Sequence, residues 1–121
     1  MSSPFIHFEV AGKDPAKLQS FFGDLFGWKI DANNPMNYGM VDVGSADVAG
    51  GVGPAPEGQP GHAMFYIGVD DVEAALAKAE SLGGSRVFGP MEVPEGPTIG
   101  HFADPEGHVV GLVTPPPEAA A

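Results

Sequence analysis

The sequence predicts an α+β fold in which one strand–helix–strand–strand–strand (βαβββ) pattern occurs twice in tandem. Three observations lead to this prediction. The chain has 121 residues, 43% of them hydrophobic, which fits one domain with its own core. Each half contains a β-rich run followed by a capped helix of similar length. The two halves also align with each other through constant offsets, which is the sign of an internal repeat.

The first half begins with the β-rich run FIHFEV at residues 5–10. Asp14 and Pro15 then provide the N-cap and the first position of a helix. Gly27 ends that helix, because glycine readily adopts the left-handed conformation of a C-cap. The three strands that follow are expected at residues 28–30, 38–43 and 48–52.

The same order of elements returns in the second half. A strand is expected at residues 64–69, and Asp70 and Asp71 cap the helix that follows. Gly83 and Gly84 end this helix. The remaining strands are expected at residues 86–88, 98–103 and 109–113, with a loop at residues 90–97.

These elements define the organisation of one domain over residues 1–121. Module one covers about residues 4–53, and a linker rich in proline and glycine covers residues 54–61. Module two covers about residues 62–114. The tail at residues 115–121 is expected to be disordered.

Two offsets align the modules. One aligns the first strands and helices, and a slightly larger one aligns the later strands, because the second module has a longer loop. The aligned pairs are Asp14 with Asp71, Gly27 with Gly84, Gly39 with Gly100, and Gly50 with Gly111.

Composition excludes several kinds of function. The chain carries 16 Asp and Glu against 5 Lys and Arg, a formal net charge of −11. Such a surface repels nucleic-acid phosphates and anionic lipid, so we expect no nucleic-acid partner and no membrane partner. The chain has no cysteine, which excludes disulfides, thiolate nucleophiles and cysteine-bound zinc. The sequence shows no secretory signal, and a cytoplasmic protein is expected.

Side chains alternate between the two faces of a strand, and this alternation selects candidate site residues. On the first strand, Ile6, Phe8 and Val10 are apolar and should face the helix. His7 and Glu9 should then point to the opposite face. On the matching strand of the second half, Met64 and Tyr66 are expected to point to that same face.

Three segments carry a resemblance to a known family. They are HFEVAGKDPAKLQSFFGDLFGW (His7–Trp28), VDDVEAALAKAESLGG (Val69–Gly84) and FADPEGHVVGLV (Phe102–Val113). With them the chain resembles the glyoxalase, bleomycin-resistance and extradiol-dioxygenase group, the vicinal oxygen chelate superfamily. The resemblance implies a curved mixed sheet that forms a cup around a small-molecule pocket, with the helices on its outer face. It also implies a homodimer.

The resemblance further implies a divalent metal held by the first and last strands of each module. On this chain those positions are His7, Met64, Gly50 and Gly111, and relatives commonly carry glutamate where the two glycines stand. Of the four residues only His7 is a good ligand for the usual metals. We therefore expect no cofactor. The alternative is a two-His-one-carboxylate metal set formed by His7, Glu9 and His62.

The candidate catalytic residues are His7 and Glu9. The candidate ligand-binding residues are Met64, Tyr66, His62, Gly50, Gly111 and Phe102. A purely structural alternative is a His–Glu hydrogen bond without a ligand, because buried polar groups need partners in any fold.

Three kinds of function are compatible with these residues. The first is a metal-free small-molecule pocket without an assigned activity. The second is an isomerase or lyase similar to lactoylglutathione lyase, or a dioxygenase, with a non-standard metal site around His7. In the isomerase, His7 or Glu9 would remove a proton beside a carbonyl group. The third is a structural or protein-interaction domain, so the sequence leaves open whether the protein is an enzyme.

Overall fold

The computed structural model describes residues 3–44, 48–56, 58–94 and 96–114, and among them it forms eight strands and two helices. The elements are, in order, β1 (Phe5–Gly12), α1 (Pro15–Phe26), β2 (Lys29–Asp31), β3 (Gly39–Asp42), β4 (Ala49–Pro54), β5 (His62–Gly68), α2 (Val72–Ser81), β6 (Ser85–Glu92), β7 (Thr98–Ala103) and β8 (Val109–Val113). The βαβββ order therefore occurs twice, which confirms the α+β prediction. The chain divides into a first unit at residues 6–65 and a second unit that contains residues 3–5 and 66–114.

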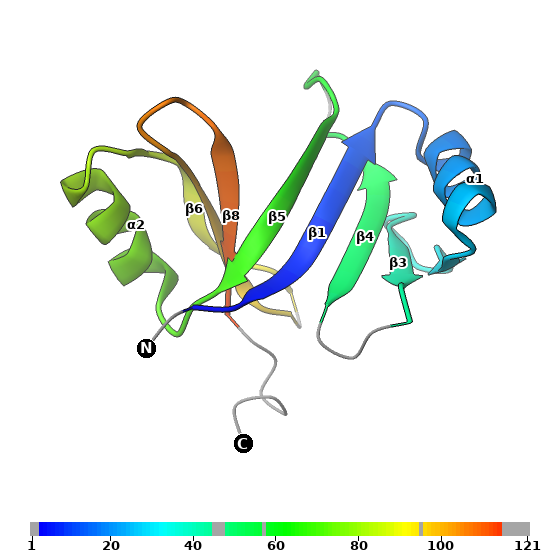
Figure 1. Ribbon diagram of the computed structural model, residues 1–121, viewed down its shortest axis with the longest axis horizontal. Coiled ribbons are helices and arrows are strands. Elements are labelled where there is room, and N and C mark those ends of the chain that lie inside the picture. Colours follow the sequence, from blue (N-terminus) through cyan, green and yellow to red (C-terminus); the bar gives the residue numbers. More distant parts are fainter. Residues whose placement is uncertain (1–2, 45–47, 57, 95, 115–121) are drawn as a thin grey trace. The chain divides into compact units, whose positions relative to one another are not determined.

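The first unit contains the strand order β2–β3–β4–β1. β1 runs parallel to β4, whereas β3 is antiparallel to both β4 and β2, so the sheet is mixed. Helix α1 lies along one face of these strands and packs against β4 (Figure 1). Aromatic rings fill the space beneath it. The ring of Trp28 lies 5.3 Å from that of Phe8 and 6.0 Å from that of Phe22.

Local chemistry sets the ends of α1 as the sequence predicts. The Asp14 side chain accepts a hydrogen bond from the backbone amide of Lys17 at 3.1 Å, and Pro15 opens the helix. Gly27 ends it in the left-handed conformation, with φ at 71°. None of the helix residues is fully buried, and Leu25 is 58% exposed. Neither α1 nor α2, the helices of the described residues, is long and apolar enough to cross a bilayer.

The second unit repeats this arrangement with the strand order β5–β8–β7–β6. β5 runs parallel to β8, and β7 is antiparallel to β8 and β6. Asp71 caps α2 by accepting from the amide of Ala74 at 3.0 Å. The core under this helix is formed by Val72, Leu76 and Leu112, which are 2%, 0% and 4% exposed.

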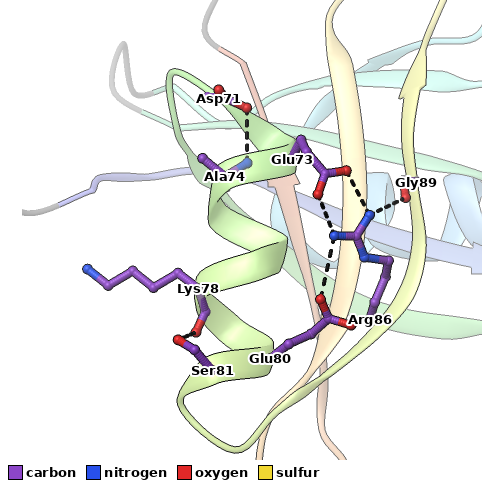
Figure 2. A network of polar contacts seen from close by, with 8 residues as sticks. All are labelled: Asp71, Glu73, Ala74, Lys78, Glu80, Ser81, Arg86 and Gly89. Atoms are coloured by element: carbon purple, nitrogen blue, oxygen red, sulfur yellow. Dashed lines mark hydrogen bonds and ion pairs between the residues drawn. The ribbon is translucent and has the colours of Figure 1, made fainter.

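Arg86 links α2 to β6, as Figure 2 shows. Its two terminal nitrogens bind the two carboxylate oxygens of Glu73 at 2.8 and 2.6 Å, and Glu80 lies 3.6 Å away. The hydrogen bond from Arg86 lowers the pKa of Glu73, and the Glu73 carboxylate raises the pKa of Arg86. An exposed pair of this kind adds little stability. The pair does keep the Arg86 guanidinium bound to Glu73 and close to Glu80, both in the second unit.

Several strands extend beyond their predicted bounds, among them β1, which reaches Gly12, and β5, which starts at His62. β6 runs to Glu92 rather than ending at Phe88, so part of the predicted loop at residues 90–97 is strand. Its pairing with β7 is irregular on both sides of Phe88. Pro90 fits because β6 is the last strand in its unit's order, where a missing N–H breaks no ladder. β4 likewise ends at Pro54, and the predicted tail at residues 115–121 lies outside the described residues.

The α2 core gives a paired stability prediction. We expect Leu76→Ala to lower the free energy of unfolding by about 2–5 kcal/mol, because it removes a fully buried side chain and leaves a cavity. Leu82→Ala is the matched control, since Leu82 follows the same helix but is 71% exposed. It should change stability by less than about 0.5 kcal/mol. Urea denaturation measures both, and equal losses would contradict this description of the core.

Candidate functional site

The two faces of β1 carry different chemistry, as its alternation predicts. Phe8 lies opposite Gly50 of β4 and contacts Trp28, which places it on the α1 side. His7 and Glu9 therefore point to the other face, where both reach the side chain of Tyr38. The polar side chains on this face form the candidate site.

Glu9 is the centre of that group. Its Oε2 atom lies 2.6 Å from Nε2 of His62, and its Oε1 atom accepts a hydrogen bond from the Tyr38 hydroxyl at 3.1 Å. The same hydroxyl lies 3.2 Å from Nε2 of His7. We refer to Glu9, Tyr38, His7 and His62 as the Glu9 cluster. The Glu9 side chain is 18% exposed and that of His62 is 32% exposed, so the cluster is half-buried but reachable.

The direction of each hydrogen bond follows from the number of hydrogens available. A phenol has one hydrogen, and an ionised carboxylate can only accept. Tyr38 gives its hydrogen to Glu9, so His7 must donate its Nε2 hydrogen to the Tyr38 oxygen. Burial lowers the pKa of His7, while Glu9 opposes this shift, so burial favours the neutral imidazole. The hydrogen bonds therefore all lead to Glu9, from His62 on one side and from His7 through Tyr38 on the other.

Sequence reasoning missed Tyr38, which stands just before β3. The side chain of Asn34 fixes the backbone of Tyr38 through two hydrogen bonds. Asn34 Nδ2 donates to the Tyr38 carbonyl oxygen at 2.7 Å, and the Tyr38 backbone N–H donates to Asn34 Oδ1 at 3.0 Å. A side chain at Gly51 or Gly53 of β4 would overlap the Tyr38 ring. The glycine-rich run of β4 was the signal that could have indicated a ring lying across this strand.

The strand register corrects the predicted pairing of Gly50 with Gly111. Glu9 lies opposite Gly51, and Tyr66, its equivalent in the repeat, lies opposite Gly111. Gly51 is therefore the true counterpart of Gly111. The predicted match was wrong by one residue, and a shift of one residue reverses the face of a strand. Gly50 faces α1, where a Cβ atom would overlap the Phe8 ring, so it lies away from the candidate site.

Both glycines make room for a tyrosine. A Cβ atom at Gly111 would overlap the Tyr66 ring, just as one at Gly51 would overlap Tyr38. Tyr66 is 5% exposed, and its hydroxyl lies 3.0 Å from Nε2 of His101. A tyrosine ring of the same module thus lies over Gly111, one of the positions that the family resemblance assigns to a metal ligand.

The other predicted ligand-binding residues have different surroundings. Phe102 packs against the core under α2, on the face opposite Tyr66, which is a correction to its expected place in the site. Met64 is half-buried on β5. His101, rather than Phe102, lies on the same face as Tyr66. It contacts the Tyr66 hydroxyl, and its ring lies 5.3 Å from that of Phe88.

The donors do not fit the divalent metal that the family resemblance implies. Within the described ranges, no group of three or more His, Asp or Glu side chains is placed to hold a metal ion. Glu9 contacts His62 directly but reaches His7 only through the Tyr38 hydroxyl. The two-His-one-carboxylate alternative therefore lacks three donors that converge on one point.

Comparison with known proteins identifies the family. The family model described as the glyoxalase/bleomycin resistance protein/dioxygenase superfamily matches residues 5–112. The chain belongs to this superfamily. This glyoxalase-superfamily chain is also 35% identical over 85 residues to CFP32 of Mycobacterium tuberculosis and of Mycobacterium bovis, provisionally named a glyoxylase. That match covers 68% of this chain but 31% of each relative, so the chain spans about a third of their length.

Other proteins match over most of the chain. A glyoxylase-like domain-containing protein of Didymella fabae is 28% identical over 116 residues, covering 89% of this chain and 91% of that protein. Methylmalonyl-CoA epimerase from Mycobacterium tuberculosis has a TM-score of 0.66 at 18% identity, covering 97% and 91%. A Bacillus halodurans C-125 protein has a TM-score of 0.71 at 13% identity, with 96% of both chains covered. At these identities the solved structures show a shared fold alone.

The space above Gly51 gives a second prediction. We expect Gly51→Ala to destabilise the protein by about 1–3 kcal/mol, because the new methyl group must displace the Tyr38 ring. Gly23→Ala is the control. Gly23 lies within α1, where an added Cβ would meet only ordinary contacts, so this change should stabilise by about 0.5–1 kcal/mol. Urea denaturation of the two variants tests this account, and a Gly51→Ala protein as stable as wild type would refute it.

Proposed function

We propose that the domain binds a small carbonyl compound at the Glu9 cluster and moves a proton at the carbon beside the carbonyl group. This is lyase or isomerase chemistry. The observation that carries the proposal is the 2.6 Å contact between Glu9 and His62, with Tyr38 on the second oxygen of the same carboxylate. A carboxylate that holds an imidazole in this way is the usual arrangement of a general base.

His62 is the proposed base, in place of His7 or Glu9. By accepting the Nε2 hydrogen of His62, Glu9 fixes the tautomer and leaves the lone pair on Nδ1. Glu9 itself has a partner on each of its oxygens, and His7 acts as a donor to Tyr38. With its side chain 32% exposed, His62 can reach a ligand from solvent.

The proposed step balances without a co-reactant. The C–H bond beside the carbonyl breaks, its proton moves to Nδ1 of His62, and its electrons form the enolate. Glu9 stabilises the resulting imidazolium, as carboxylates do in other acid–base pairs. Return of the proton to the opposite face of the same carbon inverts that centre. In an α-hydroxy carbonyl compound, return to the former carbonyl carbon, while the hydroxyl proton passes to the enolate oxygen, gives an isomer. Methylmalonyl-CoA epimerase has a similar fold, and this likeness of fold is its whole support for the proposed class of reaction.

Charge favours a neutral carbonyl compound over a polyanionic one. The net charge of −11 repels anions, and a bound anion would need a local cation. Arg86 is already engaged by Glu73 and Glu80 in the second unit. Among the described residues, the side-chain hydrogen-bond partners of Glu9 are Tyr38 and His62, neither of them a lysine or arginine. A homodimer and a cytoplasmic location stay predictions.

Hydrogen exchange at carbon tests the proposal. The protein is incubated in D2O with hydroxyacetone, acetoin or pyruvate, and loss of the proton signal beside each carbonyl is followed by NMR. We expect exchange with the neutral compounds to exceed that with pyruvate. His62→Gln and Glu9→Gln should each lower the rate by about 10²–10⁴-fold, the usual contribution of a general base.

His108→Gln is the matched control for that assay. His108 also pairs with a carboxylate, that of Asp104 at 2.9 Å, but its side chain is 72% exposed in a turn. This variant should exchange at the wild-type rate. The proposal fails if the wild-type protein shows no exchange above buffer, or if His62→Gln has no effect.

A further inference from the structure

We infer that Tyr38 is a second catalytic residue, whose hydroxyl holds the carbonyl oxygen of the ligand while His62 removes the proton. The inference rests on the proposed function and supplies the hydrogen-bond donor to the enolate oxygen that this function requires. An enolate needs a hydrogen-bond donor at its oxygen, because charge develops there as the C–H bond breaks. Tyr38 is the O–H donor that the Glu9 cluster contains.

The geometry places the acid and the base on one carboxylate. Tyr38 binds Oε1 of Glu9 and His62 binds Oε2. The two groups are therefore held next to each other by a single side chain. Enolisation needs such a pair, since the carbonyl oxygen and the acidic carbon are separated by one atom of the substrate.

A single phenol hydrogen couples the two roles. In the resting protein Tyr38 gives this hydrogen to Glu9. When it turns to the carbonyl oxygen, Glu9 loses one donor. At the same moment His62 becomes a cation, and its hydrogen bond to the Glu9 carboxylate becomes a stronger ion pair. Each change therefore offsets the other as the reaction proceeds.

His7 supports the phenol oxygen throughout. Its Nε2–H donates to that oxygen at 3.2 Å, so the oxygen keeps a donor when its own hydrogen turns away. A donor on the phenol oxygen makes its O–H a stronger donor in turn, because hydrogen bonds in a chain polarise one another. This gives His7 a defined role, that of a positioning residue behind Tyr38.

The protein fixes Tyr38 before any ligand binds. The Asn34 side chain binds both the N–H and the carbonyl of Tyr38, and Gly51 and Gly53 leave room for the Tyr38 ring. Preorganised donors of this kind are effective because they need little rearrangement during the reaction. Tyr66 provides an internal comparison, since its ring lies over Gly111 but its hydroxyl pairs with His101.

The test compares Tyr38→Phe with Tyr66→Phe in the hydroxyacetone exchange assay. These are the two tyrosines of the chain, and each substitution removes one hydroxyl while keeping the ring. We expect Tyr38→Phe to lower kcat by about 10²–10³-fold, the usual effect of removing one oxyanion donor. KM should change far less than kcat. Tyr66→Phe should lower kcat far less, because the Tyr66 hydroxyl pairs with His101 rather than with Glu9.

The outcomes separate this inference from the proposed function. An active wild-type protein with an equally active Tyr38→Phe variant would overturn the inference and leave His62 as base. An inactive wild-type protein would overturn the proposed function and the inference with it. If Tyr38→Phe does not fold, Gly51→Ala replaces it, because it displaces the ring while keeping the hydroxyl. Full activity of a folded Gly51→Ala protein would also overturn the inference.

Discussion

One half-buried carboxylate, that of Glu9, organises the polar face of the first unit. A carboxylate removed from water needs hydrogen-bond donors, and each of its oxygens has one here. The donors come from distant parts of the chain, His62 from the start of β5 and Tyr38 from the turn before β3. His7 adds a third donor behind Tyr38. The proposed base and the proposed acid both depend on this one acceptor.

Glycine in β4 makes this arrangement possible. Glycine weakens a strand, because it packs no side chain and loses more backbone freedom on folding. Gly51 and Gly53 instead provide the surface on which Tyr38 lies. The second module repeats the device with Gly111 and Tyr66. The hydroxyl partners differ, however, since Tyr38 binds a carboxylate and Tyr66 binds a histidine. A tyrosine ring therefore lies over the equivalent glycine in each half, but it comes from a different element, the turn before β3 for Tyr38 and β5 for Tyr66.

The sequence predicts what depends on neighbouring residues. Caps such as Asp14 and Asp71 act within four residues, so both helices start where predicted. The alternation of β1 likewise separates His7 and Glu9 from Phe8. Pairing between strands is a different matter. The one-residue choice between Gly50 and Gly51 is made by the register of β4 against β1, which local patterns do not reveal. Tyr38 was missed for the same reason, because its partner Glu9 lies 29 positions away.

The direction of the hydrogen bonds into Glu9 decides which group can act as base, and ¹⁵N NMR of the imidazole rings measures this direction. The spectra are recorded at pH 8.5, where ordinary imidazoles are neutral. The structure predicts that His7 and His62 both carry their hydrogen on Nε2, with Nδ1 unprotonated. In a Glu9→Gln protein the preference of His62 for this tautomer should weaken. A hydrogen on Nδ1 of either histidine in the wild-type protein would contradict the account.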